Sequence, residues 1–423
     1  MRSLNRKLSD NTILVIGVVI FILLLLLPES NDPWQAGIRS QECAMLSPLP
    51  ALSCKLSIGI RMNADIMRQA SLTLKGRGDP TDIAQDIVGF RALANRQDPY
   101  PILGPAYRSL GLEWVGEVRN ASTHPPMAFL FVAPIAFLSW NWASALWAWL
   151  MITLVILSFR CYGISWKAAI GLTPIALLWP PVATSLGQLT IIWLFALSAG
   201  YYFERTKQFW SGIFIGLGAI TKFFPGVLII SFLLKRKWIA LLGFVSTFIL
   251  SIILLLLLEP SSIYRYFEAS QSTSSIAMIL RLDNASLLIN SYRFGGWVGV
   301  TMVLFLFLSI IWTNRDYFYA PLLYSSPRSW VLLSFFSVAL LPISWVFSLA
   351  PLLPIVIILI TRKKLSTLII GVCCIVIPFI FPSYGTAIPS AVVVLLVGVG
   401  LLFDGLPFKL FTAVSLQDFR GSA

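Results

Sequence analysis

The sequence predicts an all-α polytopic membrane protein, and three observations support this fold class. Hydrophobic residues make up 57% of the 423 residues, and the mean hydropathy is +0.83. Charged residues make up only 12%, whereas about one-quarter of a soluble protein is charged. Apolar runs long enough to cross a bilayer recur along the chain, so we expect a bundle of about eleven to thirteen membrane helices.

The N-terminal segment, residues 1–28, is predicted to be a membrane anchor helix. Arg2, Arg6 and Lys7 precede an apolar run at 12–28, which is the order found in a signal peptide. The run is long, however, and no small-x-small cleavage site follows it. We therefore interpret the segment as an uncleaved first helix whose N-terminus faces the cytoplasm.

Residues 29–126 form a long polar stretch that holds much of the chain's acid. It contains possible helical patches at Ile60–Leu74 and Ile83–Leu93, so we expect a large, partly folded non-cytoplasmic loop. Cys43 and Cys54 lie in this loop, and they could form one disulfide if the loop faces an oxidising compartment.

Residues 127–403 are predicted to form the polytopic bundle, and residues 404–423 a cytoplasmic tail. Several apolar runs of the bundle are shorter than the ~20 residues that a straight span needs, and Pro and Gly interrupt many of them. Short or broken helices are tolerated in a membrane where they are covered by protein or line a cavity. The pattern therefore indicates a cavity that opens to one face.

Loop charges predict the orientation of the bundle. The net charge is +13, which we ascribe mainly to basic residues that collect in cytoplasmic loops. Arg160 and Lys167 fit either side. The other basic groups that we place in the cytoplasm are Arg205, Lys207, Lys235–Lys237, Arg315, Arg328 and Arg362–Lys364.

Several function classes lack support in the sequence. There is no Walker A motif and no Gly-x-Gly-x-x-Gly on a strand–helix turn, so no soluble nucleotide-binding domain is expected. No basic aromatic surface suggests nucleic acid as a partner. A single histidine and the absence of ligand spacing argue against a metal site, and we expect no metal and no cofactor.

Acidic residues in the large loop are the first candidates for chemistry. Asp86–Phe90 is followed by Asp98–Tyr100, and a carboxylate in an external loop can accept a proton from an attacking hydroxyl. Asp82, one helical turn before Asp86, is equally eligible. The simpler interpretation of both is a solvated loop acid.

A family resemblance rests on these residues and on others that follow in order. The stretch Asp86–Leu93 with Asp98–Tyr100 looks like the first-loop motif of glycosyltransferase family 87, whose members are polyprenyl-phosphate-sugar-dependent enzymes of the GT-C superfamily. Five further elements resemble that family from 124 to 345: His124–Pro126 with Phe129–Leu138, Gly187–Leu189, Gly212–Pro225 with Lys235–Trp238, Asn284–Leu287 with Arg293, and Pro342–Trp345.

The resemblance implies a GT-C-type helical bundle and assigns roles residue by residue. Asp86 falls on the position of the family's general base, and Lys222 on a lysine able to pair with the donor phosphate. Arg293 and Arg265 are further phosphate candidates. A snorkelling lysine is the alternative for Lys222.

The remaining candidates are polar and aromatic residues expected to bind substrate. Gln188 and Asn284 could hydrogen-bond sugar hydroxyls, with capping or turn formation as the alternative. Trp345 and Tyr100 could stack on sugar or lipid, or anchor the chain at the interface. His124 could be a pocket residue or could sit at the membrane surface.

Two departures from the family pattern stand out. The family commonly has a histidine just after its Ser-Trp element, whereas this chain reads Val346-Phe347-Ser348 after Trp345. The first loop is also longer than expected, and residues 30–80 could form an added lid or an acceptor-docking element.

Taken together, the resemblance implies an inverting hexosyltransferase. The donor would be a polyprenyl-monophosphate sugar, with mannose favoured, and the acceptor a glycolipid or cell-envelope glycan. We expect a bacterial plasma membrane with the active site facing outside, and the endoplasmic reticulum is the alternative membrane. A transporter or flippase of lipid-linked glycans is the main alternative, and it predicts ionisable residues deep within the spans. A lipid-linked glycan polymerase or ligase is a third, which would need a large late external loop.

Overall fold

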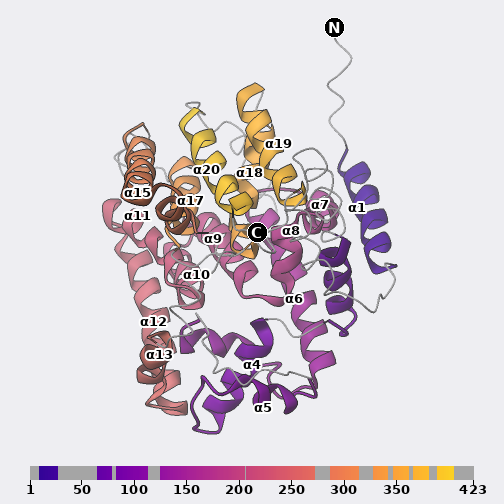
Figure 1. Cartoon of the computed structure of the whole chain (residues 1–423), viewed down its shortest axis with the longest axis vertical. Coiled ribbons are helices and arrows are strands. Elements are labelled where there is room, and N and C mark those ends of the chain that lie inside the picture. The colour runs from indigo at the N-terminus through magenta and orange to yellow at the C-terminus, as the bar shows by residue number, and fades with distance from the viewer. Residues whose placement is uncertain are drawn as a thin grey trace.

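A computed structural model describes most of the chain and is helical throughout the described ranges (Figure 1). These ranges are 9–26, 64–78, 82–112, 124–204, 206–271, 286–313, 327–341, 346–361, 365–380 and 388–403. No strand occurs within them, which confirms the predicted all-α class. Cys43, Cys54 and the 404–423 tail lie outside them, so their predicted roles stay predictions.

The helices follow one another with short breaks. Their bounds are α1 Asp10–Leu25, α4 Asp82–Ala94, α5 Leu103–Arg108, η1 Pro126–Val132, α6 Trp140–Cys161, α7 Trp166–Leu177, α8 Pro180–Ala183, η2 Thr184–Gly187, α9 Thr190–Glu204, α10 Gln208–Thr221, η3 Phe224–Leu228, α11 Ile229–Leu234, α12 Trp238–Leu258, α13 Ser262–Ser270, α15 Leu287–Thr313, α17 Pro327–Ala339, η4 Val346–Leu352, α18 Leu353–Thr361, α19 Leu365–Ile380 and α20 Ile388–Phe403. A further helix covers 64–74.

Among the described residues, three helices are long and apolar enough to cross a membrane. They are α6, α12 and the Gly295–Thr313 part of α15. A fourth span results if α7 and Pro180–Gly187, which meet at 96°, count as one broken span. Several other apolar helices have only 10–17 residues, so fewer helices reach spanning length than the eleven to thirteen expected spans.

The apolar run at 127–139, which resembles the start of a membrane helix in the family, does not form a regular helix. It forms the short 3-10 helix η1 and then a series of turns, and the regular helix α6 begins only at Trp140. Pro134 interrupts the run, and a proline inside a helix removes a backbone hydrogen bond and clashes with the preceding turn. The segment therefore packs beside α4, with which η1 is in contact.

The N-terminal helix is attached to α7 at a very close crossing. A Cβ atom on Gly17 would lie 2.1 Å from the carbonyl oxygen of Gly171, so only glycine permits this approach. At the helix starts, Ser165 hydrogen-bonds Asp10 and Lys167 Nζ lies 3.1 Å from Asn11 Oδ1. Lys167 therefore lies at the same end of the bundle as the start of α1.

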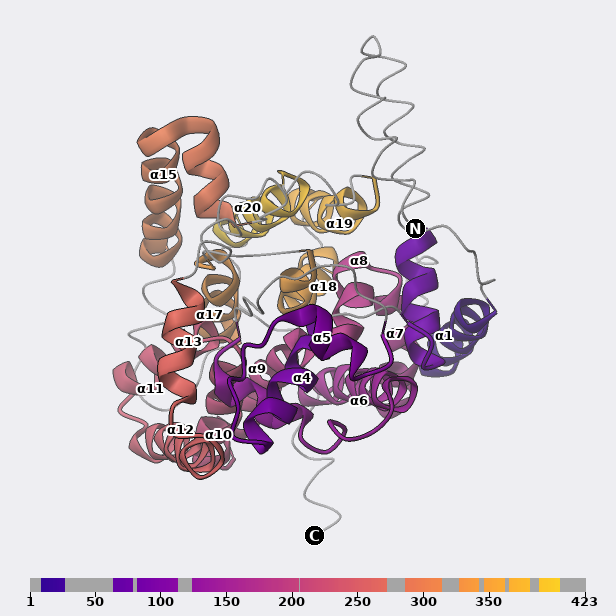
Figure 2. The same cartoon turned by 60° about the horizontal axis from the view of Figure 1, so that its bottom comes forward.

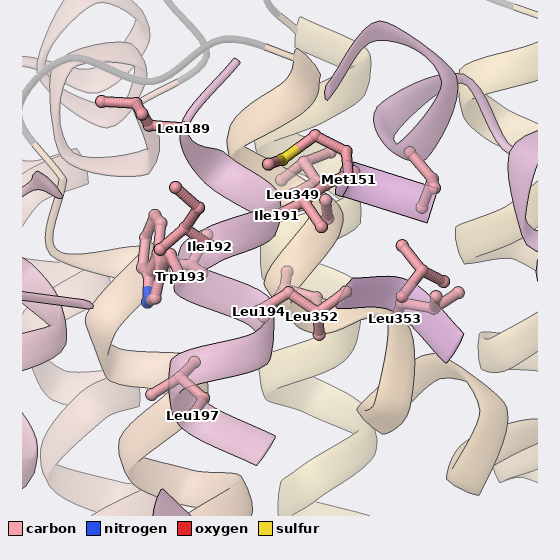
Figure 3. Packing of buried hydrophobic residues seen from close by; sticks show 14 of the residues in the cluster. Met151, Leu189, Ile191, Ile192, Trp193, Leu194, Leu197, Leu349, Leu352 and Leu353 are labelled. Carbon is pink, nitrogen blue, oxygen red and sulfur yellow. The ribbon is translucent and has the colours of Figure 1, made fainter. Parts of the chain in front are cut away.

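The core of the bundle forms around α9. This helix contacts α6, α10 and η4. Figure 3 shows side chains of α9 meeting those of η4, α6 and α18. The labelled residues are Met151, Leu189, Ile191, Ile192, Trp193, Leu194, Leu197, Leu349, Leu352 and Leu353, all of which are buried.

The segment that carries the candidate acids lies at one end of this core. α4 and α5 occupy the end opposite the start of α1 in Figure 1, and Figure 2 brings that end forward. α4 contacts η1, α5 and α12. The helical patches predicted at Ile60–Leu74 and Ile83–Leu93 are confirmed where they are described, as the 64–74 helix and α4.

Candidate active site

Helix α4 presents Asp82 and Asp86 on one side. The two residues are four apart, and residues at that spacing are neighbours on a helix surface. The helix is fixed by Arg91, whose Nε donates to the Ala136 carbonyl at 2.6 Å and whose Nη2 donates to the Leu138 carbonyl at 3.1 Å. These bonds hold α4 against the turns that follow η1.

Asp86 is the most deeply buried acid of the pair and is bonded to the chain's single histidine. Its side chain is 0% exposed, and its Oδ1 lies 2.9 Å from Nδ1 of His124, which is 5% exposed. An ionised carboxylate can only accept, so Nδ1 of His124 is the donor. The other oxygen, Oδ2, is buried and has no hydrogen-bond partner among the described residues.

His124 is held in place through its backbone. The Tyr100 hydroxyl donates to the His124 carbonyl at 3.1 Å, and the Tyr100 amide donates to Asp98 Oδ1 at 2.9 Å. Burial raises the pKa of Tyr100 well above its usual value, so the phenol keeps its proton and remains a donor. Tyr100 also packs against Phe129 of η1, with ring centroids 5.6 Å apart.

A glycine allows α4 to approach this arrangement. A Cβ atom on Gly89 would lie 2.9 Å from Cε2 of Phe129, closer than ordinary contact. The ring of Phe129 therefore fills the space where a larger residue would place its side chain. This contact seats α4 on η1 immediately after the His124–Pro126 turn.

Asp82 joins Asp86 to two residues from distant parts of the chain. Burial raises its pKa, and the Asp86 charge raises it further, whereas His124, Lys222 and a hydrogen bond from Gln188 lower it. Desolvation is the largest of these effects, so the folded site disfavours a charge on Asp82 overall. The Lys222 ammonium also interacts with the Asp86 carboxylate.

Breaks in two apolar helical regions place Gln188 and Lys222 in the site. Gln188 directly follows Pro180–Gly187, the segment that bends away from α7, and it has an extended backbone. Lys222 ends α10 with an extended backbone, and Pro225 follows three residues later. Each break exposes polar groups that a continuous helix would pair internally.

The site combines the Lys222 cation with two acceptor oxygens that can each take a further hydrogen bond. Gln188 is 6% exposed, and its Oε1, like Oδ2 of Asp86, is buried without a hydrogen-bond partner among the described residues. Buried polar atoms are normally hydrogen-bonded, so such atoms need an explanation. A ligand with hydroxyl groups and an anionic group would complement two acceptor oxygens and an ammonium.

A second cluster of buried charge lies elsewhere in the bundle. Glu204 at the end of α9 has a fully buried side chain, and its Oε1 lies 2.7 Å from Lys237 Nζ and 3.5 Å from Lys235 Nζ. The indole of Trp330 donates to its Oε2. Both oxygens of Glu204 therefore have protein partners.

The structure brings together some of the residues predicted from the sequence and separates others. Asp86, His124, Gln188 and Lys222 come together, and Tyr100 supports them from a fully buried position. Asn284 and Trp345 lie outside the described residues.

The two arginine candidates lie on other elements. Arg293 donates to Asn290 at 3.2 Å within α15, and both cartoons place α15 away from α4 (Figures 1 and 2). Arg265 of α13 pairs with Glu268 at 3.3 Å, where both side chains are more than 40% exposed. Neither pairing supports the predicted contact with a donor phosphate.

Sequence reasoning did not anticipate the pairing of His124 with Asp86. The two residues are 38 positions apart, and no local pattern reports a contact at that distance. The one available signal was that the chain's single histidine follows an acid-rich segment and precedes Pro125-Pro126.

These features define an all-α membrane protein with a buried cluster of acids, an imidazole and a cation. The sequence model of glycosyltransferase family 87 matches residues 123–317, a little under half of the chain. This match confirms the resemblance predicted from the sequence and indicates a membrane glycosyltransferase. The matched segment includes His124, Gln188 and Lys222, whereas α4 with its carboxylates precedes it. A search of the curated proteins gives no match, and neither does a search of the solved structures.

Proposed function

We propose that this protein is an inverting hexosyltransferase that takes a sugar, with mannose favoured, from a polyprenyl-monophosphate donor. The acceptor is a glycolipid or a cell-envelope glycan. One observation carries the proposal: Asp86 has one carboxylate oxygen fixed by His124, while the other is buried without a partner among the described residues, near the Lys222 cation.

Asp86 serves as the general base. Its Oδ2 takes the proton of the acceptor hydroxyl while the oxygen of that hydroxyl forms a bond to the anomeric carbon of the sugar. The bond from the anomeric carbon to the donor phosphate oxygen breaks, and its electron pair stays on the phosphate. A carboxylate that is ionised and positioned before the reaction is suited to this proton transfer.

Lys222 stabilises the phosphate that leaves. Lys222 lies at a helix break, where its ammonium interacts electrostatically with Asp82 and Asp86. A donor phosphate bound to Lys222 would therefore lie close to the base. Charge that develops on a leaving group is a major target for stabilisation in enzymes. Gln188, held by Asp82, offers its unpartnered Oε1 to a sugar hydroxyl.

The reaction is assigned to the non-cytoplasmic face of a bacterial plasma membrane. α9 begins just after Gln188 and runs 15 residues, about 22 Å, to Glu204 and its two lysines. Basic residues collect on the cytoplasmic side. The acid-rich end of the bundle would then face outward, where a lipid-linked donor supplies the sugar without a soluble nucleotide.

The test is sugar transfer by the full-length protein in phospholipid vesicles. The donors are polyprenyl phosphates carrying different sugars, mannose among them, and the acceptors are a panel of glycolipids. We expect transfer from at least one donor, and a fall in kcat of about 10²- to 10⁴-fold in Asp86→Asn.

Asp65→Asn is the matched control, because it removes a carboxylate from the same segment. Asp65 pairs with Arg68 at 2.7 Å, and we expect transfer to be unchanged. Full activity of a folded Asp86→Asn would overturn the assignment of the base. Movement of labelled lipid across the bilayer without consumption of any donor would favour a flippase instead.

A further inference from the structure

The contact between His124 and Asp86 involves only one of the two carboxylate oxygens. Nδ1 of His124 lies 2.9 Å from Oδ1, and Oδ2 remains buried without a partner among the described residues. The imidazole is itself buried, with 5% of the side chain exposed. Its backbone is tied down by the Tyr100 hydroxyl, so the ring cannot easily move away from the acid.

We propose that His124 is a positioning residue that binds Oδ1 of Asp86 and thereby presents Oδ2 to the acceptor hydroxyl. The sequence had suggested a substrate contact for His124, whereas the geometry points to an effect exerted through Asp86. This inference rests on the proposed function, in which Asp86 is the general base.

The physical need for such a residue follows from the charges around Asp86. The side chains that act on this carboxylate come from several elements, and they include Asp82 on its own helix and Lys222 from the end of α10. Without a fixed partner, the carboxylate could turn toward the ammonium and be lost as a base. The hydrogen bond from His124 holds the carboxylate in one orientation.

The two acids of α4 are thereby given different partners. Asp82 accepts a hydrogen bond from Gln188, but its burial disfavours the charged carboxylate overall. Asp86 accepts its hydrogen bond from His124. A base that is oriented by a third group is a recurrent arrangement in enzymes that activate a nucleophile. The difference in partners selects Asp86 over its neighbour for proton transfer.

Two substitutions of His124 separate positioning from simple space filling. In His124→Asn, the amide nitrogen takes nearly the place of Nδ1 and can still donate to Oδ1. In His124→Phe, a ring of similar size remains but no donor does. With polyprenyl-phosphate mannose or whichever panel donor the wild type consumes, we expect kcat to fall about 10- to 100-fold in His124→Phe.

We further expect the KM values for donor and acceptor to stay within about threefold, because His124 does not act on the ground-state binding of substrate. His124→Asn should recover most of the lost kcat. In the Asp86→Asn background, His124→Phe should cause no additional loss, because residues that act as a unit are not additive. A parallel rise in KM, failure of Asn to rescue, or additive losses would each overturn the proposal.

A spectroscopic measurement tests the pairing without reference to activity. The chain has one histidine, so ¹⁵N-labelled histidine in the full-length protein reports on His124 alone. We expect a spectrum in which Nδ1 is the protonated, hydrogen-bonded nitrogen, and a change in that signal in Asp86→Asn but not in Asp65→Asn. An Nδ1 signal that is indifferent to Asp86→Asn would refute the pairing.

The kinetic measurements and the ¹⁵N spectra together distinguish failure of this inference from failure of the proposed function. If the wild type consumes no donor but the Nδ1 signal depends on Asp86, the pairing stands and the glycosyl-transfer reaction is wrong. If transfer is lost in Asp86→Asn but is insensitive to His124→Phe, the base stands and the positioning role is wrong.

Discussion

Two buried clusters of charge occupy different regions of this bundle, and they differ in whether their hydrogen bonds are complete. At Glu204, both carboxylate oxygens are taken up by Lys235, Lys237 and Trp330. At Asp86, one oxygen is bonded to His124 and the other has no partner among the described residues. Burial of charge is therefore common to both regions, whereas of the two carboxylates Asp86 has an oxygen without a hydrogen-bond partner among the described residues.

This difference separates structural from functional roles. A buried charge with complete partners is costly to disturb but offers nothing to a ligand. A buried acceptor without a partner is unfavourable, and a ligand that supplies a donor removes that cost.

The largest expected effect on stability is at Glu204. Glu204→Gln removes the charge that the buried Lys235 and the partly buried Lys237 share, and removing one partner of a buried ion pair typically costs about 3–5 kcal/mol. Thermal unfolding in detergent or lipid measures this loss, and transfer per folded molecule should be unchanged. The matched control is Glu268→Gln, whose exposed pair with Arg265 is worth at most about 1 kcal/mol. A selective loss of transfer in Glu204→Gln would mean that this cluster also serves the reaction.

The next effect is on donor binding at Lys222. Lys222→Met keeps a long apolar side chain and removes the ammonium that acts on both α4 acids. We expect the donor KM to rise about 10- to 100-fold, which corresponds to one or two charge-assisted contacts. Steady-state kinetics with varied donor measures it. Lys207→Met, at an exposed position, should leave the donor KM unchanged, and equal effects of the two variants would argue against a phosphate site.

A smaller effect on stability, a gain instead of the loss expected at Glu204, is expected on replacing Asp82. Burial raises the pKa of this carboxyl, so its protonated form favours the folded state and its ionised form disfavours it. Its contribution is favourable below the ordinary pKa of about 3.9 and is lost as the pH rises through the raised value. Asp82→Asn should therefore raise the melting temperature by a few degrees near neutral pH.

This gain should shrink as the pH is lowered toward 4, because the wild-type carboxyl then becomes neutral as well. Melting temperatures across a pH series measure the difference between the two proteins. If Asp82→Asn is destabilising at neutral pH, the attraction to Lys222 and the hydrogen bond from Gln188 outweigh the cost of burial.

The smallest effects, on both stability and kcat, are expected on replacing Tyr100. Tyr100→Phe leaves the His124 carbonyl without its donor, at a cost of about 0.5–1.5 kcal/mol in stability. The kcat should fall by less than about tenfold, because the imidazole keeps its bond to Asp86. Tyr264→Phe, at a site that is 69% exposed, is the control. A loss of kcat as large as that of Asp86→Asn would show that Tyr100 takes part directly in the reaction.

Composition and local sequence patterns were enough to predict the class of the protein and the local features of the site. Composition and apolar runs fix an all-α membrane protein because a bilayer demands such segments. Asp86 on a helical patch, and the helix breaks at Gln188 and Lys222, follow from hydrophobic periodicity and from nearby Pro and Gly, which act over a few residues.

The contacts between these residues arise from the packing of segments that are distant along the chain. The bond from His124 to Asp86 joins positions 38 apart, and Asp82 meets Gln188 and Lys222 from more distant segments. The structure also placed Tyr100 in the core, kept α15 away from α4, and turned the 127–139 run into a short 3-10 helix with turns. Such outcomes depend on packing between segments that are remote in sequence, whereas composition and periodicity report only on neighbours along the chain.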